Sequence, residues 1–214
     1  MPLGIIVGLA AEARIAGRLG RVAIGGGTPA GAEAAAERLV AEGATALLSF
    51  GLAGGLDPAL RPGALVVPAS VLADGARYAT DADLCRALGG TTAATMLAGR
   101  DIVADVAAKH RLSIETGACA VDLESGAVAR VATGHHLPFA VLRAVCDPAG
   151  RGLPRAAIVA IDARGAIAAW RILAALAARP WEVAGLIALA FDAARARHAL
   201  GAAAASFARR LGGG

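Results

Sequence analysis

Short apolar runs that alternate with stretches of small, helix-forming residues constrain this chain more than any other feature of its sequence. Each run is the length of a buried strand and lies next to a turn signal or a candidate helix start. The four clearest are Gly4–Leu9, Ala46–Phe50, Ala64–Val71 and Pro138–Cys146. Between the first two, Thr28 is a suitable N-cap for a helix from Pro29 to about Glu42. Strands that alternate with helices predict an α/β sandwich with a mostly parallel sheet.

The remaining segments extend this pattern as far as Asp147 and then change it. Further predicted strands are Val22–Ile24, Thr91–Leu97 and Ala118–Val121, and further predicted helices are Asp81–Leu88, Asp101–His110 and Glu124–Ala132. Gly51–Gly55 is predicted to be a glycine-rich turn. After Asp147 only helices are expected, over Leu153–Asp162, Ala166–Ala178 and Pro180–Leu200. We therefore expect a core over residues 1–150 and a helical C-terminal part, residues 151–214, of the same domain.

Composition limits the class of protein. The 214 residues are 57% hydrophobic and only 3% aromatic, yet no charge-free run approaches the roughly 18 residues of a membrane span. The N-terminal residues lack the basic n-region and the small-residue cleavage site of a signal peptide, so none is expected, and the three cysteines follow no disulfide or zinc pattern. A reducing cytoplasm is the expected location. Residues 143–214 hold ten arginines against four acidic residues, but the scarcity of aromatic residues argues against nucleic-acid binding.

Two carboxylates follow predicted strands closely. Glu124 comes shortly after Ala118–Val121, and Asp147 ends Pro138–Cys146. In open α/β sheets, ligands bind outside the carboxyl ends of the strands, so both side chains are expected to face one crevice. The alternative is structural: Asp122 and Glu124 would only favour a helix N-terminus, and Asp147 would only begin an Asp-Pro turn.

Together with two other segments, these stretches resemble a known superfamily. AVDLES and LRAVCD, the opening GIIVGLAAEARIA, and SFGLAGGLDPALRPGALVVP resemble the purine nucleoside phosphorylase and methylthioadenosine/adenosylhomocysteine nucleosidase superfamily, which cleaves ribose–purine bonds. The chain is most similar to the hopanoid-associated phosphorylase type, which shares VGLAAEARIA, SFGLAGGLDP and an Arg- and Leu-rich C-terminal extension. The resemblance implies a three-layer sandwich with a twisted, mostly parallel central sheet and a helical C-terminal extension.

The resemblance also implies roles for acidic residues. Cleavage of an N-glycosidic bond leaves a cationic sugar and a poor leaving group, so it needs a proton donor at the base. Asp147 matches the general acid that protonates adenine at N7, and desolvation by its apolar strand would keep it protonated. Glu124 matches the residue that holds the ribose hydroxyls, with Leu123 in the place of a methionine under the sugar. Glu12 matches the carboxylate that orients or deprotonates the attacking water.

Other residues would bind or support the nucleoside. Small residues at Gly51, Ala53 and Gly54 would let the main chain approach the sugar and base. Asp101 and Ile102 lie where the family holds the purine with backbone groups. Arg143 is expected to pair with a strand-tip carboxylate and support the site without doing chemistry.

The choice of nucleophile depends on two replaced residues. Phosphorylases of this superfamily hold phosphate with an arginine and a serine or threonine where this chain has Ser49 and Leu52. Neither supplies the bidentate charge that clamps a phosphate, which favours water. Main-chain N–H groups of Gly25–Gly27 at a helix start could still bind an anion, so inorganic phosphate stays open as a co-substrate. No other cofactor is expected.

Two further patterns suggest a dinucleotide site or a metal site, and both are incomplete. A dinucleotide-binding spacing is present at Gly25, Gly27 and Ala30, but the acidic residue required after the next strand is missing. His135 and His136 lack partners at metal-ligand spacing, so no metal site is expected.

Apolar residues at helical spacing form a C-terminal stripe, which consists of Val183, Leu186, Ile187 and Ala190. Core packing is the simplest explanation of this stripe. The alternative is an apolar and basic face, with Arg195 and Arg197 beyond the stripe, that contacts an anionic membrane.

The expected function is cleavage of the N-glycosidic bond of an adenosyl compound with release of adenine. The resemblance implies adenosylhopane, a lipid-linked substrate, and a homodimer or a hexamer, between which the sequence does not choose. The expected location is the cytoplasm, with peripheral contact with an anionic membrane if the C-terminal stripe faces lipid. Two alternatives stay open. One is a nucleosidase for soluble methylthioadenosine or adenosylhomocysteine, and the other is a non-catalytic nucleoside-binding module.

Overall fold

The chain folds as a three-layer α/β sandwich in a computed structural model, which describes residues 2–158 and 179–212. The centre is a sheet of order β2-β1-β3-β8-β7-β5-β6, and β9 pairs with β3 and β4. The pairs β1·β2, β1·β3, β3·β9, β5·β7 and β7·β8 are parallel. Three pairs, β3·β8, β4·β9 and β5·β6, are antiparallel. The mostly parallel sandwich expected from the alternating runs is confirmed.

The strands and helices have these bounds. The strands are β1 (Leu3–Val7), β2 (Arg21–Ile24), β3 (Ala46–Gly55), β4 (Leu65–Val66), β5 (Pro68–Ala73), β6 (Ala76–Ala79), β7 (Ala93–Ala98), β8 (Ala120–Asp122) and β9 (Phe139–Asp147). The helices are α1 (Ala10–Ala16), α2 (Pro29–Ala41), α3 (Ala82–Ala87), α4 (Val106–Thr116), α5 (Ser125–Gly134), α6 (Arg155–Ile158) and α8 (Val183–Gly212), with a 3-10 turn, η1 (Pro180–Glu182), before α8.

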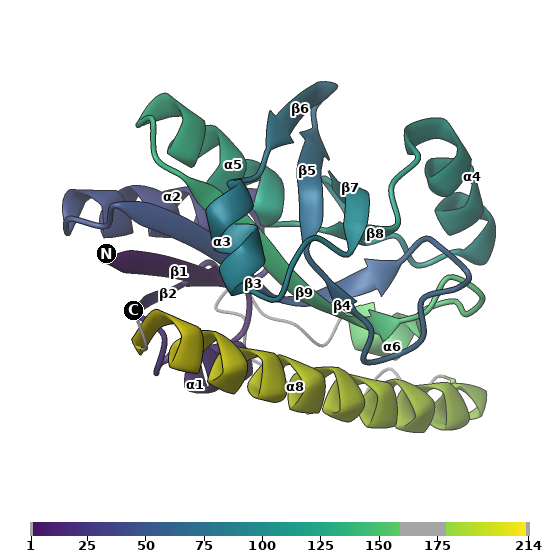
Figure 1. Cartoon of the computed structure of the whole chain (residues 1–214). Helices are drawn as coiled ribbons and strands as arrows, with labels where there is room; N and C mark the ends of the chain where they lie inside the picture. The colour runs from purple at the N-terminus through teal and green to yellow at the C-terminus, as the bar shows by residue number, and fades with distance from the viewer. Residues whose placement is uncertain (1, 159–178, 213–214) are drawn as a thin grey trace.

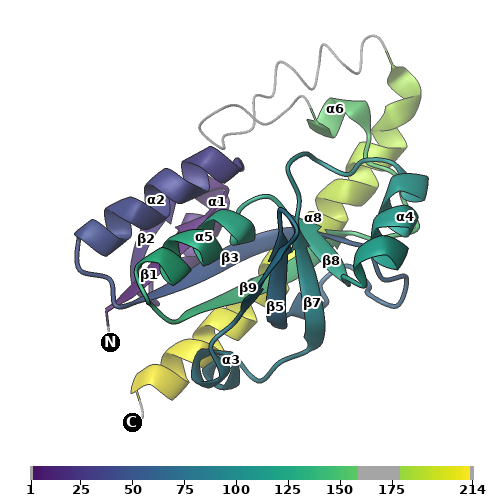
Figure 2. The same ribbon diagram turned by 90° about the horizontal axis from the view of Figure 1, so that it is seen from above.

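The two faces of the sheet are covered by different helices, as Figures 1 and 2 show. Successive residues of a strand point to opposite faces. In β1, Ile5 packs towards α1, α3 and α8, whereas Ile6 packs towards α2 and α5. Because the helix positions at the sheet are largely alanine, the helices lie close to the strands.

Two predicted helix starts had different outcomes, and a capping residue explains each. Thr28 accepts a hydrogen bond from the N–H of Gly31, so α2 begins at Pro29 as expected. The helix predicted over Asp101–His110 instead runs over Val106–Thr116, because Asp105 caps it by accepting from Ala108. Asp101 and Ile102 therefore lie on the loop before α4.

Two strand predictions were wrong in detail. Gly51–Gly55 is not a turn: β3 continues through it to Gly55, with β9 on one side. The strand predicted over Ala64–Val71 is two strands, β4 and β5, which pair with β9 and with β6 and β7 respectively. The local sequence pattern could not predict the extent of β3 or the division into β4 and β5, because both depend on pairing with strands that are distant in the sequence.

The C-terminal stripe is not core. Val183 and Ile187 are 41% and 52% exposed, which contradicts the core-packing interpretation. The core face of α8 lies further along the helix, at Ala196, Leu200, Ala204 and Phe207. The helix predicted over Ala166–Ala178, and the end of that over Leu153–Asp162, lie outside the described residues. None of the helices in the described ranges is long and apolar enough to cross a membrane.

Substitution of two phenylalanines of α8 tests which face of this helix packs against the sheet. Phe207 is 1% exposed and packs in the core, whereas Phe191 on the same helix is 68% exposed. We expect Phe207→Ala to lower the free energy of unfolding by about 3–5 kcal/mol and Phe191→Ala to change it by less than about 0.5 kcal/mol. Urea denaturation of both variants is the measurement. Equal losses would show that α8 does not pack as described.

Candidate active site

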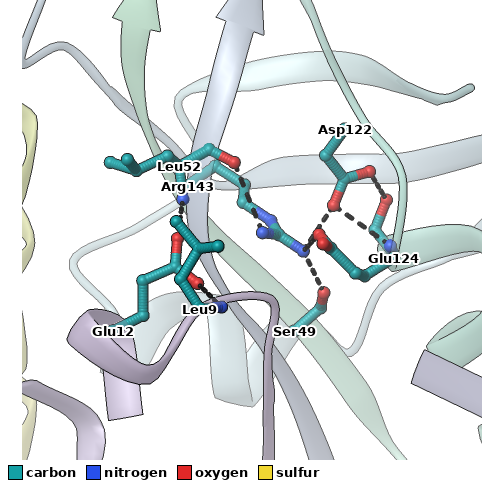
Figure 3. A network of polar contacts seen from close by, with 8 residues as sticks. Leu9, Glu12, Ser49, Leu52, Asp122, Glu124 and Arg143 are labelled. Carbon is teal, nitrogen blue, oxygen red and sulfur yellow. Dashed lines mark hydrogen bonds and ion pairs between the residues drawn. The ribbon is translucent and has the colours of Figure 1, made fainter. Parts of the chain in front are cut away.

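Arg143 is the centre of a buried polar cluster (Figure 3). Its side chain is 1% exposed and comes from β9. Nη2 pairs with the carboxylate of Asp122, lies 2.9 Å from Glu124 Oε2 and donates to Ser49 Oγ at 2.6 Å. Nη1 donates to the carbonyl of Leu52 at 3.3 Å. The expectation that Arg143 pairs with strand-tip carboxylates agrees with these contacts.

A glycine makes room for this arginine. Gly51 of β3 lies opposite Arg143 in the β3·β9 register. A methyl group added at Gly51 would lie 2.7 Å from Arg143 Nη1 and 2.6 Å from Glu12 Oε1. Because contacts this short would force one of these groups to move, Gly51 allows the arginine and the glutamate to meet above the strand.

Glu12 joins this cluster from the first turn of α1. It is 2% exposed. Its Oε2 accepts from the N–H of Leu9 at 2.8 Å, and its Oε1 accepts from the N–H of Leu52 at 2.9 Å. Burial raises the pKa of Glu12, while Arg143 and the main-chain donors oppose this shift. A carboxyl group with a raised pKa is better suited to accept a proton near neutrality than an exposed one.

Glu12 and Glu124 approach the same piece of main chain. A methyl group added at Gly8 would lie 2.5 Å from Glu124 Oε1 and 3.5 Å from Glu12 Oε2. Burial raises the pKa of Glu124 to about 7, Arg143 lowers it, and the charges of Asp122 and Glu12 raise it further. Three carboxyl groups therefore surround one guanidinium, so the cluster has an excess of negative charge when all are ionised.

Asp122 and Ser49 were not expected in this cluster. Asp122 had been interpreted only as a residue that favours a helix start. It does accept from the N–H of Ser125 at 3.1 Å, at the beginning of α5, and it also pairs with Arg143. The acidic residue two positions before Glu124 was the available signal, but only the placement of β9 shows that both carboxylates face one arginine.

Asp147 lies at the end of β9 and is 3% exposed. Its Oδ2 is 2.5 Å from Nζ of Lys109, which belongs to α4 and is fully buried. Burial raises the pKa of Asp147, and the hydrogen bond and charge of Lys109 oppose this shift. Lys109 was missed from the sequence. Its being the only lysine of the chain was the one signal available.

A β-bulge orients the end of β9. Ala53 of β3 is opposite Val145, but the next residue, Gly54, is opposite Asp147, so Cys146 has no partner in the register. Bulges bend the strand and re-aim side chains, and they are common beside active sites. Gly54 lies between β9 and β8, where it pairs with Asp147 and with Val121.

The other predicted residues are distributed around this region. Ala53 and Gly54 lie on β3, beside the cluster. Leu123 is half-buried and lines a cavity of about 230 Å³ together with Gly99. Asp101 and Ile102 are exposed on the loop between β7 and α4. Within the described ranges, no side-chain hydrogen bond or ion pair joins these two residues to the Arg143 cluster.

Among residues 2–158 and 179–212, no group of three or more His, Cys, Asp or Glu side chains is arranged to hold a metal ion. His135 contacts a surface carboxylate instead: its Nε2 is 2.9 Å from Glu37 Oε2.

Comparisons with known proteins agree with this fold. Residues 14–178 match the family model described as the phosphorylase superfamily. No curated protein matches the chain. Among solved structures, the S-adenosylhomocysteine nucleosidase from Streptococcus pyogenes, in complex with 5-methylthiotubericidin, is 19% identical with a TM-score of 0.64, over 70% of this chain and 84% of that one.

Two structures from Helicobacter pylori are also similar. Its 5'-methylthioadenosine/S-adenosyl homocysteine nucleosidase is 18% identical with a TM-score of 0.64, over 70% of this chain and 86% of that one. A futalosine hydrolase mutant is 17% identical with a TM-score of 0.60, over 68% of this chain and 89% of that one. The chain belongs to the phosphorylase superfamily and is an enzyme of that family with the nucleosidase fold.

Proposed function

We propose that this enzyme hydrolyses the N-glycosidic bond of an adenosyl compound and releases adenine. The observation that carries the proposal is the burial of three carboxyl groups, Glu12, Glu124 and Asp147, at one end of the sheet. Arg143 contacts Glu124 directly and lies close to Glu12. Buried acidic side chains are costly unless they are paired or functional, and pKa values shifted by burial are typical of active sites.

The spacing along β9 suits a nucleoside. Asp147 lies four residues beyond Arg143, and a strand rises about 3.3 Å per residue. A ribose held at Glu124, beside Arg143, would therefore place its base towards Asp147. Asp147 donates a proton to N7 of the departing adenine, and the bond from the anomeric carbon to the base breaks. Glu12 accepts a proton from the water that attacks the same carbon.

Water suits this site better than phosphate. Ser49 accepts from Arg143, and the N–H of Leu52 is bound to Glu12, so neither is available to clamp an anion. The excess of carboxyl groups over guanidinium at Arg143 also repels a phosphate. Phosphorolysis would need a cationic site, which this cluster does not offer.

Replacing the proton donor tests the proposal. We expect the wild-type protein to release adenine from adenosyl compounds, and Asp147→Asn to lower kcat by about 10²- to 10⁴-fold because general-acid assistance is lost. Asp83→Asn, at an exposed position of α3, is the matched control and should keep full activity. Chromatographic detection of free adenine is the measurement. A wild-type protein that binds adenosine but releases no adenine from any adenosyl compound would support the non-catalytic module instead.

The same assay, run with and without phosphate, identifies the nucleophile. Hydrolysis gives free ribose derivatives at a rate independent of phosphate. A rate that rises with phosphate, together with a ribose 1-phosphate product, would overturn the assignment to water.

The pH profile should report Glu124. Its pKa is raised to about 7 by burial, and we expect it to act as a carboxylate beside the cationic sugar. As the pH falls below about 7, Glu124 gains a proton, so kcat/KM should fall by up to about tenfold per pH unit. Glu124→Gln should be slower, and its acid limb should move, because only Glu12 is then left to gain a proton there. An acid limb at an unchanged pH in this variant would assign the titration to another group.

We further propose that the adenosyl group is linked to a lipid, as in adenosylhopane. An apolar face at the start of α8 supports this: Trp181, Val183, Ile187 and Phe191 are 72%, 41%, 52% and 68% exposed. This face is connected to the site, because Asp192 of α8 pairs with Arg151 in the loop after Asp147. Such an apolar face, with Arg195 nearby, suits peripheral contact with an anionic membrane. We propose that the protein makes this contact from the cytoplasm, as a homo-oligomer.

Vesicle binding tests this second part. We expect the protein to co-sediment with vesicles containing anionic lipid, and the Trp181→Ala/Phe191→Ala double variant to lose most of this binding. Ile114→Ala, which removes a 72% exposed side chain from α4, is the matched control. Binding that is indifferent to anionic lipid and to salt would count against a membrane contact.

A nucleosidase for soluble substrates is the second candidate. It is favoured by the similar structures, whose names include methylthioadenosine and S-adenosylhomocysteine nucleosidases. A kcat/KM for methylthioadenosine above that for a short-chain adenosylhopane mimic would select it.

A further inference from the structure

Lys109 is a buried cation beside Asp147 to which none of the expected roles gives a function. It lies on α4, is fully buried, and holds Oδ2 of Asp147 at 2.5 Å. Lysine is almost never fully buried unless it is paired, and moving an ammonium out of water costs several kcal/mol. The only lysine of the chain is therefore buried against an acidic side chain. We look for the reason for this burial in the function of Asp147.

All the donors of this ammonium are occupied. Besides Asp147, Nζ donates to the carbonyls of Pro148 at 3.1 Å and Arg151 at 2.8 Å. An ammonium has three N–H donors and no acceptor, so no donor is left for a substrate. The two carbonyls also keep Nζ in place whether or not Asp147 carries a proton. Lys109 can therefore act on a substrate only through Asp147.

The two oxygens of Asp147 are thereby made unequal. Oδ2 is bound to Lys109, whereas Oδ1 is buried and has no hydrogen-bond partner in the described part of the chain. A buried carboxyl oxygen without a partner is unusual in a folded protein. Only Oδ1 is placed to carry and transfer a proton, because a proton on Oδ2 would face the ammonium.

We propose that Lys109 is the positioning residue of Asp147: it binds Oδ2, so the proton passes to the departing base from Oδ1. This inference rests on the proposed function and adds a residue to it. In the reaction the Oδ1–H bond breaks as the bond from hydrogen to N7 of the base forms. The electron pair of Oδ1–H stays on Asp147, whose carboxylate is then stabilised by Lys109.

The other charges near Asp147 come from two elements. Arg151, in the loop after β9, lowers its pKa, and Asp192 of α8 raises it. Arg151 and Asp192 pair with each other, and their effects on the pKa of Asp147 oppose one another. The adjacent thiol of Cys146, whose pKa burial raises to about 12, is neutral at the pH of an assay. Burial raises the pKa of Asp147 most, and among the neighbouring charges Lys109 has the largest effect on it.

Removing the charge at constant size is the test. In Lys109→Met we expect kcat to fall about 10- to 100-fold, by analogy with the hydrogen-bond partners that orient metal ligands. The alkaline limb of the rate profile, where Asp147 loses its proton, should move upward by about one pH unit or more, because an adjacent cation lowers a carboxyl pKa. Lys109→Gln, which keeps a donor but no charge, should shift the limb in the same direction by less, because the hydrogen bond also lowers the pKa of Asp147, and it provides a second variant if the first does not fold.

Two controls separate positioning from a purely structural role. Leu112→Ala loosens the packing of α4 against β8 without contacting Asp147, so it should lower stability and leave the alkaline limb in place. The Asp147→Asn/Lys109→Met double variant should be no slower than Asp147→Asn alone, because Lys109 acts through that carboxyl. An unshifted limb in both lysine variants, or additive losses in the double variant, would overturn the proposal.

A measurement that needs no turnover distinguishes a failure of the role proposed for Lys109 from a failure of the proposed function. In protein labelled with ¹³C at aspartate carboxyls, the signal missing from Asp147→Asn belongs to Asp147. Its titration should move to higher pH in Lys109→Met even if no adenosyl compound is cleaved. If adenine release is found but this titration does not move, the function stands and the role of Lys109 is wrong.

Discussion

The buried guanidinium of Arg143 is the interaction on which the rest of the site depends. It contacts Asp122 and Glu124 and holds Ser49 and Leu52 of the neighbouring strand. Removing one partner of such a buried ion pair costs about 3–5 kcal/mol, because a charge is left without compensation. The arginine therefore fixes where the acidic side chains lie, and the fold tolerates them because they face it. Burial raises the pKa of Glu124, and because one cation cannot neutralise every carboxyl group around it, the charges of Asp122 and Glu12 raise it further.

A second buried cation organises the other end of the site. Lys109 binds Asp147 and two carbonyls of the following loop, and Arg151 of this loop pairs with Asp192 on α8. The acid at the end of β9 is thereby connected to two helices that approach from different sides. Two ion clusters on one strand, one at Arg143 and one at Asp147, divide the site into a sugar-holding part and a base-protonating part under the proposed mechanism.

Much of the fold could be predicted from the sequence, because its signals are local. Alternating apolar runs gave the strands, and Thr28 with Pro29 gave the start of α2. The predicted bounds were wrong where two local signals competed for a helix start, or where pairing with a partner strand decided how far a strand extends. Asp105 capped α4 in place of an earlier start, and β9 extended β3 through its glycines. Of the site, Glu12, Glu124, Asp147 and Arg143 were named from motifs, whereas Asp122, Ser49 and Lys109 were not.

The sequence by itself determined most of the segments that become strands and helices, and which acidic residues follow them, since periodicity, caps and turn residues act over a few positions. Only the tertiary structure decided what faces those acids. Arg143 meets Asp122, and Lys109 meets Asp147, across 21 and 38 positions of the chain. Ion pairs of this kind are made by strand register, a bulge and the docking of a helix. These depend on how segments distant in sequence pack together, and therefore leave no periodic signal in the sequence.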